Sequence, residues 1–354
     1  MKKLLQLSVL LLSAALVFTS LVAFHSSPSS AAPVPAPDAI MLNGAGASFP
    51  YPIYAKWFSD YNKLHSDIQI NYQSIGSGGG IRQLLSGTVD FGASDAPMND
   101  EQLGQAKTKI LHFPTVLGAV VPTYNIPDLS EELKFTPEIL ADIYLGKITK
   151  WNDAEIAKSN KGVNLPAQDI VVVHRSDGSG TSYVWTDYLS KTSAEWQSKV
   201  GRSTSVNWPV GLGGKGNEGV TGLVKQTPGA IGYVELNYAV QNQIAYGRVR
   251  NAAGAFVKAD LASVTAAAAG YAKTMPEDFR VSITNAPGKA SYPICSFTYL
   301  LVPTTIADAN KKPVIKDFLN WMLRDGQNDT EALSYARLPK EVVAKELKLI
   351  SEIH

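Results

Sequence analysis

Apolar and polar residues follow two different spacings along the chain, and the two spacings alternate. Between residues 52 and 64 the apolar positions recur every three or four residues, which predicts an amphipathic helix. Residues 68–75 then alternate singly between apolar and polar side chains, which is typical of a strand. Over the whole chain, the two spacings predict helices at 52–64, 79–87, 136–145, 180–190 and 217–226 with two or three more from residue 309, and strands at 68–75, 89–95, 111–126, 169–174, 230–236 and 295–303.

The order of these elements predicts an α/β fold. Strands that alternate with helices tend to pair in parallel, so we expect mainly parallel sheets flanked by helices. Pro114 and Pro122 fall within the long apolar run 111–126, and we expect them to break that strand. The Ala-rich part, 251–290, gives no clear pattern.

The N-terminus has the pattern of an export signal. Lys2 and Lys3 precede a short apolar run, and small residues at 29–32 offer a cleavage site. We therefore expect residues 1–32 to be a signal peptide and residues 33–39 a flexible leader, which would make the mature protein periplasmic. An uncleaved membrane anchor is the alternative.

Cysteine content and charge exclude several classes of protein. Cys295 is the only cysteine, so no internal disulfide can form, and we expect its thiol to be buried and inert. Without the signal peptide the chain has 30 basic and 31 acidic residues, and this balance argues against nucleic acid or an anionic membrane as the main partner. The remaining length of about 320 residues suits two lobes better than one core.

Glycine and hydroxyl residues gather at three predicted helix starts. The clusters are NGAGASFP (43–50), GSGGG (76–80) and GSGTS (178–182). Unpaired N–H groups and the positive end of the helix dipole favour an anion there, and glycine lets the anion approach closely. Each cluster alone also suits an ordinary helix cap. Three of them converging on one cleft would form an anion site.

Charged residues beside the clusters narrow the choice of ligand. Arg175 ends the strand before the third cluster, Asp177 follows two residues later, and Asp95 ends the predicted strand 89–95. A surface ion pair is the alternative for Arg175 and Asp177. Asp95 would repel sulfate but can accept a hydrogen bond from HPO₄²⁻ or H₂PO₄⁻. A buried unpaired acceptor costs roughly 1–3 kcal/mol, and about 1.4 kcal/mol corresponds to tenfold in affinity, so such a site would discriminate strongly.

Nucleotide-binding and catalytic motifs do not fit these clusters. None matches G-x-x-x-x-G-K-[ST] or a G-x-G-x-x-G followed by an acidic residue, and GSG is not the nucleophile turn G-x-S-x-G. His174 would face away from Arg175 on an extended strand, and no metal-ligand spacing is present. A serine-dependent phosphate-ester hydrolase remains the alternative from another class of protein.

Five longer segments resemble one protein family. They are GAGASFPYPIYAKW, GSGGGIRQLLSGTVDFGASDAP, RSDGSGTSYVWTDYLS, WPVGLGGKGNEGV and PGAIGYVE. In this order they resemble the periplasmic phosphate-binding proteins of high-affinity phosphate ABC transporters, from about residue 42 to residue 340. The resemblance implies a two-lobed type II periplasmic-binding-protein fold, with phosphate held in the cleft between the lobes.

The resemblance also implies which residues hold the ligand. Arg175 would be the cationic partner, oriented by Asp177, and Asp95 would accept the ligand proton. Hydroxyl and backbone N–H groups would donate from the three helix starts. The complete implied phosphate-binding set is Ser48, Phe49, Ser77, Asp95, Arg175, Ser179, Gly180 and Thr181, with neither a cofactor nor a metal.

The lobes and the partners follow from the same resemblance. Lobe 1 would comprise residues 40–121 plus 291–354, and lobe 2 residues 122–290. The expected partners are inorganic phosphate and the membrane permease subunits of an ABC transporter, with no nucleic acid, and the protein is expected to be a monomer without enzymatic activity. The alternatives are a binding protein for another oxyanion or a phosphorylated metabolite, and an adhesion or scavenging protein that has no permease partner.

Overall fold

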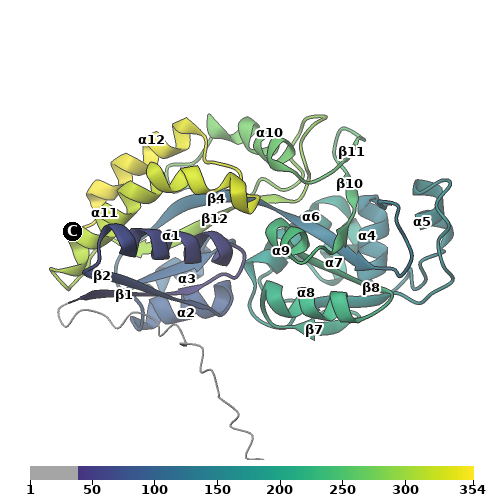
Figure 1. Ribbon diagram of the computed structural model, residues 1–354, viewed down its shortest axis with the longest axis horizontal. Coiled ribbons are helices and arrows are strands. Elements are labelled where there is room, and N and C mark those ends of the chain that lie inside the picture. Colours follow the sequence, from purple (N-terminus) through teal and green to yellow (C-terminus); the bar gives the residue numbers. More distant parts are fainter. Residues whose placement is uncertain (1–38) are drawn as a thin grey trace, which may run out of the picture. The chain divides into compact units, whose positions relative to one another are not determined.

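A nine-stranded sheet runs through residues 39–354, the part of the chain that the computed structural model describes (Figure 1). The predicted signal peptide and residues 33–38 of the predicted leader lie outside the described residues. The strand order is β2-β1-β3-β12-β4-β8-β6-β7, β9 pairs with β4, and β11-β10-β5 form a separate small sheet. The strands are β1 (Ile40–Gly46), β2 (Ile68–Ser74), β3 (Phe91–Ser94), β4 (Ile110–Asn125), β5 (Lys134–Phe135), β6 (Val171–Arg175), β7 (Leu212–Gly214), β8 (Ala230–Glu235), β9 (Ala245–Tyr246), β10 (Arg248–Arg250), β11 (Phe256–Val257) and β12 (Cys295–Pro303).

Helices pack against the sheet along its length. Figure 1 shows α1 and α11 on one side of β1 and β2 and α2 on the other, while α6 and α8 pack near β8. The helices are α1 (Tyr51–Leu64), α2 (Ser77–Ser86), α3 (Asp100–Gly104), α4 (Pro137–Tyr144), α5 (Ala154–Ser159), α6 (Gly180–Thr192), α7 (Ala194–Lys199), α8 (Gly216–Gln226), α9 (Leu236–Gln241), α10 (Leu261–Ala272), α11 (Lys311–Leu323) and α12 (Lys340–Leu349), with 3₁₀ turns at Asp325–Asp329, Glu331–Leu333 and Ile350–Glu352.

The α/β class predicted from the sequence is confirmed, and the sheet is mixed. Strand β1 pairs in parallel with β2 and β3, and β6 pairs in parallel with β7 and β8. Between these two groups, β12 and β4 run antiparallel to their neighbours. The parallel pairing expected from the alternation of elements therefore holds in the two outer groups, and two long strands join them.

Strand β4 is the longest strand of the described region. The expectation that its prolines break it is wrong, because the strand runs without interruption from Ile110 to Asn125. Its first part, as far as Ala119, pairs with β12, and its second part, from Val120, pairs with β8. Pro114 lies opposite Tyr299, where the register shifts as in a β-bulge. A bulge tolerates a residue that cannot donate to the ladder, so the strand continues through this proline.

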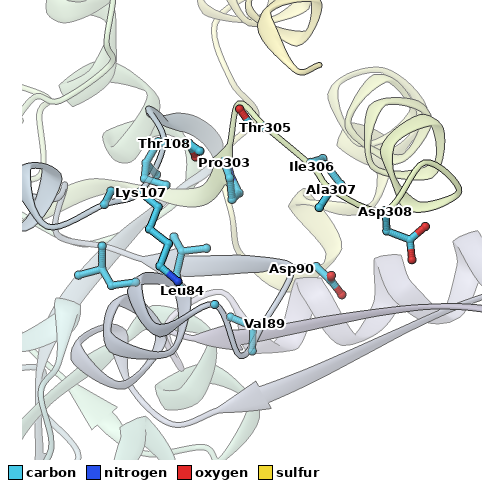
Figure 2. A pocket seen from close by; sticks show the side chains of 14 residues that line it. Leu84, Val89, Asp90, Lys107, Thr108, Pro303, Thr305, Ile306, Ala307 and Asp308 are labelled. Carbon is cyan, nitrogen blue, oxygen red and sulfur yellow. The ribbon is translucent and has the colours of Figure 1, made fainter.

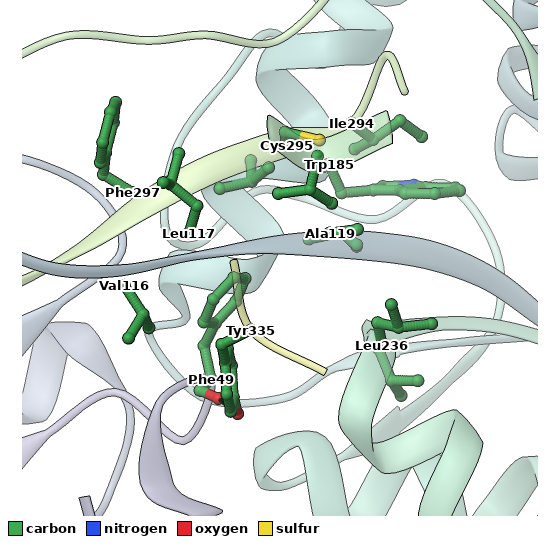
Figure 3. Packing of buried hydrophobic residues seen from close by; sticks show 14 of the residues in the cluster. Phe49, Val116, Leu117, Ala119, Trp185, Leu236, Ile294, Cys295, Phe297 and Tyr335 are labelled. Carbon is green, nitrogen blue, oxygen red and sulfur yellow. Dashed lines mark hydrogen bonds between the residues drawn. The ribbon is translucent and has the colours of Figure 1, made fainter. Parts of the chain in front are cut away.

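Most of the buried hydrophobic residues of the described region form one continuous core. Phe49 and Tyr335 are fully buried with ring centroids 6.3 Å apart, and Figure 3 shows them next to Val116 on β4. Cys295 is free and buried, as predicted, and burial raises the pKa of its thiol, which disfavours the reactive thiolate. Phe49 belongs to the first glycine-hydroxyl cluster, so this core anchors the loop between β1 and α1.

Candidate anion-binding site

The residues selected from the sequence lie buried where strands end and helices begin. Ser48 and Phe49 connect β1 to α1, Asp95 directly follows β3, and Arg175 is the last residue of β6. Such strand ends form the usual ligand edge of an open α/β sheet. All residues of the implied phosphate-binding set are buried, whereas Asp177 is partly buried. None is more than 3% exposed among Ser48, Phe49, Ser77, Asp95, Arg175, Ser179 and Thr181.

The second and third clusters are in direct contact. The Gly78 N–H donates to the Gly178 carbonyl at 2.9 Å, and the Gly180 N–H donates to Ser77 Oγ at 3.0 Å. Gly76 adopts φ +85°, and a Cβ there would lie 2.6 Å from the Gly178 carbonyl oxygen. Only glycine fits so close an approach of two backbones, which explains the glycines of both clusters.

The serine hydroxyls of the three clusters accept hydrogen bonds from the protein. Ser77 Oγ accepts from the N–H groups of Gly180 and Asp95, at 3.0 and 3.3 Å. Ser179 Oγ caps α6 by accepting from the Ser182 N–H at 3.0 Å. A hydroxyl has one proton and two lone pairs. Ser77 and Ser179 therefore keep their hydroxyl protons available to donate to a ligand.

Arg175 and Asp177 form a buried two-point ion pair. Arg175 Nε and Nη2 donate to the two carboxylate oxygens of Asp177 at 2.8 and 2.6 Å, and the Gly216 N–H adds a third hydrogen bond at 3.1 Å. Although burial favours the neutral acid, Arg175 and Gly216 hold the pKa of Asp177 below its usual value. Arg175 Nη1 is buried and has no hydrogen-bond partner among the described residues. A charged donor is thus oriented and left free.

Asp95 provides a free acceptor. Its Oδ1 accepts from the Thr298 hydroxyl at 2.8 Å, whereas its Oδ2 is buried and has no hydrogen-bond partner within residues 39–354. Burial raises the pKa of Asp95 to about 7, against the lowering effects of the Thr298 hydroxyl, the Arg175 charge and the nearby Thr181 hydroxyl. The carboxyl group can therefore take up or release a proton near neutral pH.

Glu235, at the end of β8, is a second buried carboxyl, which the sequence patterns did not single out. Its Oε2 accepts from the Asn237 N–H at 2.9 Å and lies 3.2 Å from the Tyr335 hydroxyl oxygen. Burial raises the pKa of Glu235 well above its usual range, and the charge of Asp95 adds to the rise. The neutral form of Glu235 is favoured, and in that form it can donate its proton to the Tyr335 oxygen.

The start of α8 also belongs to the site, although it was not among the residues selected from the sequence. The Asn217 N–H and Nδ2 donate to Ser48 Oγ at 3.1 and 2.9 Å, and Nδ2 also donates to Thr181 Oγ1 at 3.1 Å. The signal was present in GGKGNEG, a fourth glycine-rich helix start that fails the nucleotide motif. Thr298 was missed because it lies 203 residues from Asp95 within an apolar strand.

Two buried tyrosines fix the backbone at the first cluster. The Tyr238 hydroxyl donates to the Ser48 carbonyl at 2.6 Å, and the Tyr335 hydroxyl donates to the Phe49 carbonyl at 2.7 Å. In a trans peptide the C=O and the next N–H point in opposite directions. The bond from Tyr238 therefore sets the direction of the Phe49 N–H.

The histidines of the described region serve other roles. His174 stacks on Trp208 with ring centroids 4.9 Å apart, as expected for a packed side chain, and His112 Nε2 accepts from the Met98 N–H. Burial lowers the pKa of His112 to about 4, which suits this acceptor role. Within residues 39–354, no group of His, Cys, Asp and Glu side chains is arranged to hold a metal ion. The cluster thus offers hydrogen-bond donors and one acceptor, without a histidine base beside its serines.

A surface cavity lies apart from these residues. It has a volume of about 390 Å³ and apolar walls that include Leu84, Val89 and Ile306 (Figure 2). Asp90 and Asp308 are its acidic residues, and Asp90 is already paired with Lys311 at 2.9 Å. No selected site residue lines this cavity. The anion-binding candidate is the buried cluster, in which two helix starts touch.

The sequence and the fold match a known class of protein. A sequence model described as the PBP superfamily domain matches residues 27–326, which places the chain in that superfamily. The phosphate-binding protein PstS of Pasteurella multocida is 48% identical over 305 residues, covering 86% of this chain and 88% of the relative. The one from Methanocaldococcus jannaschii is 38% identical over 340 residues, covering 90% and 87%. The chain belongs to the family of phosphate-binding proteins PstS.

Solved structures agree on the fold. The structure of a high-affinity periplasmic phosphate-binding protein, PfluDING, bound with phosphate superposes with a TM-score of 0.69. It is 23% identical, and the match covers 87% of this chain and 93% of the other. At this identity the similarity shows the fold, and the type II architecture expected from the sequence is confirmed.

Proposed function

We propose that this protein binds inorganic phosphate, in a form that carries a proton, at the buried cluster. The proposal rests on one observation: Arg175 Nη1 and Asp95 Oδ2 are a buried donor and a buried acceptor, both without a hydrogen-bond partner among the described residues. Buried polar groups are nearly always paired. HPO₄²⁻ satisfies both at once, because its bare oxygens accept from Arg175 and its hydroxyl donates to Asp95.

The remaining contacts come from the helix starts. Ser48, Ser77, Ser179 and Thr181 would donate their hydroxyl protons, and the Phe49 N–H would donate from the backbone. The Gly180 N–H, expected to donate to phosphate, is bonded to Ser77 Oγ in this structure, so a direct contact would require it to switch partners. Asp177 would hold Arg175 in position without touching the ligand.

We further propose that the protein delivers phosphate to the membrane permease subunits of an ABC transporter. Relatives at 38–48% identity are named phosphate-binding proteins PstS, which supports this role. Removal of residues 1–32 would leave a periplasmic monomer. Among residues 39–354, no helix has the length and apolar character to cross a bilayer.

The two lobes are part of the proposal. Lobe 1 would comprise 40–121 plus 291–354 and lobe 2 would comprise 122–290, joined where β4 changes its partner from β12 to β8. The segment 251–290 also contacts elements of lobe 1, since Arg280 pairs with Asp100 and Lys345 Nζ donates to the Met275 carbonyl. Residues 39–354 belong to one compact unit.

The first experiment is calorimetry of the mature protein with phosphate, arsenate and sulfate at pH 9, where Asp95 is ionised. We expect tight phosphate binding, similar arsenate binding and very weak sulfate binding, because sulfate has no proton to donate to Asp95. Sulfate affinity equal to that of phosphate would contradict the role of Asp95. Release of phosphate from an aryl phosphate ester by the pure protein would favour the hydrolase alternative over a binding protein.

A glycine at the third helix start offers a steric test. In Gly180→Ala a Cβ would lie 2.4 Å from Asp95 Oδ2 and 2.5 Å from Ser77 Oγ, so both groups must move. We expect phosphate affinity to fall about a hundredfold, since displaced groups lose hydrogen bonds of about 1.5 kcal/mol each or more. The measurement is phosphate calorimetry.

The matched control for this substitution is Gly222→Ala. Gly222 lies in α8, and a Cβ there has nothing within 4 Å. Replacing a helical glycine with alanine stabilises by up to about 1 kcal/mol, so this variant should melt slightly higher and bind phosphate normally. Normal binding by Gly180→Ala would show that the predicted crowding does not reach the ligand.

A further inference from the structure

Asn217 uses every polar group of its side chain, and all of its partners lie at or next to the proposed site. Its backbone N–H and its Nδ2 donate to Ser48 Oγ, and its Nδ2 also donates to Thr181 Oγ1. Its Oδ1 accepts from the Glu235 N–H at 2.9 Å. The side chain is fully buried, so water does not compete for these bonds.

The orientation of the Asn217 amide is fixed by the Glu235 bond. A backbone N–H can only donate, so the amide atom facing Glu235 must be the oxygen, and the atom facing Ser48 and Thr181 must be the nitrogen. In the hydrogen bonds to Ser48 and Thr181, the Asn217 amide nitrogen is therefore the donor and the two hydroxyl oxygens are the acceptors.

This direction decides what the Ser48 hydroxyl can do. Ser48 Oγ accepts two hydrogen bonds from Asn217, at 3.1 and 2.9 Å, and these occupy both of its lone pairs. Its single proton must then be donated to another group. Thr181 Oγ1 accepts one bond from the same amide, which leaves its proton for the anion or for Asp95.

We propose that Asn217 is a positioning residue that sets the hydrogen-bond polarity of the site, a role that rests on the proposed phosphate-binding function. By donating twice to Ser48 Oγ it makes the Ser48 hydroxyl a donor toward the ligand. Asp95 then provides the acceptor, so the ligand binds in one orientation, with a protonated oxygen at Asp95.

The test is Asn217→Asp, alone and combined with Ser48→Ala. Aspartate keeps the shape of Asn217 and the acceptor for the Glu235 N–H, but its carboxylate attracts the hydroxyl protons that phosphate needs. In equilibrium dialysis with ³²P-labelled phosphate we expect about a hundredfold weaker binding in the wild-type background. In the Ser48→Ala background we expect Asn217→Asp to reduce phosphate affinity by a factor at least ten times smaller, because the Ser48 hydroxyl that Asn217 orients is absent.

The outcomes of this test are distinct. If the wild type does not bind phosphate, the proposed function fails. If the wild type binds and Asn217→Asp lowers phosphate affinity equally in both backgrounds, or does not lower it, the polarity role is overturned. An equal loss would come from charge or packing, because these effects do not need the Ser48 hydroxyl. The circular dichroism of each variant reports its folding.

A measurement on the wild type removes the dependence on variants. In the phosphate complex the Ser48 hydroxyl proton should exchange slowly and show a through-hydrogen-bond coupling to the ³¹P nucleus. A slowly exchanging Ser48 proton that lacks this coupling would also overturn the proposal.

Discussion

Arg175→Ala is expected to weaken phosphate binding about a thousandfold, the largest effect of any single substitution in the site. Arg175 is buried, its Nη1 has no hydrogen-bond partner within residues 39–354, and Asp177 holds its other two nitrogens. Removing one partner of a buried, charged hydrogen-bonded pair costs about 2–5 kcal/mol, and a thousandfold corresponds to about 4 kcal/mol. Phosphate calorimetry measures the loss.

Two further variants separate binding from folding. Arg175→Lys keeps the charge but cannot form the two-point contact with Asp177, so its affinity should lie between those of the wild type and the alanine variant. Arg248→Ala removes an arginine that is 43% exposed and paired with Glu132, and should bind normally. If Arg175→Ala unfolds and Arg175→Lys binds like the wild type, Arg175 and Asp177 are a structural ion pair rather than a ligand site.

Asp95→Asn is expected to reduce the selectivity for phosphate over sulfate by about three orders of magnitude. Thr298 donates to Oδ1, so the amide of the variant would keep its oxygen there and place its NH₂ group at the position of Oδ2. The site would then present a donor where phosphate presents its proton. At pH 9, where Asp95 is charged, we expect phosphate affinity to fall about tenfold and sulfate affinity to rise about a hundredfold, as the unpaired charged acceptor disappears.

The pH dependence of sulfate binding follows from the same group. The pKa of Asp95 is raised to about 7, so the carboxyl is protonated below this pH and can donate to sulfate. In the wild type, sulfate affinity should therefore increase as the pH falls from about 9 toward 7, by up to tenfold per unit, and level off below 7. In Asp95→Asn this dependence should vanish.

A surface carboxylate provides the control for these measurements. Asp90→Asn alters a carboxylate that is paired with Lys311 and is not part of the site, and it should leave both affinities unchanged. Sulfate affinity in the wild type that is flat between pH 9 and 6 would show that the protonation of Asp95 does not control the discrimination.

The sequence predicted the local parts of the site because they depend on neighbours along the chain. The glycine-hydroxyl clusters are read from a few adjacent residues, and each is at the start of a helix, as predicted. Asp95 and Arg175 were found at strand ends by the period of the apolar pattern. Short elements such as α5 and α7 were missed, because six residues give too little periodicity.

The partners of these residues could not be read in the same way. Asn217 reaches Ser48 across 169 residues, and Thr298 reaches Asp95 across 203. Both contacts depend on which strands pair: β12 lies beside β3, and β7 brings the start of α8 next to Arg175. The expected break of β4 failed for a related reason, since the pairing with β12 accommodates Pro114 at a register shift.

The α/β class, the family and the residue types that an oxyanion requires can be read from the chain alone, because each is encoded in short-range spacing or in long matching segments. Only the folded structure shows which hydrogen-bonding groups already have partners and which do not. It pairs Gly180 with Ser77 and leaves Arg175 Nη1 and Asp95 Oδ2 without partners in the described part of the chain. The physical reason is that hydrogen-bond saturation and burial depend on groups brought together from distant parts of the chain, and no local pattern specifies them.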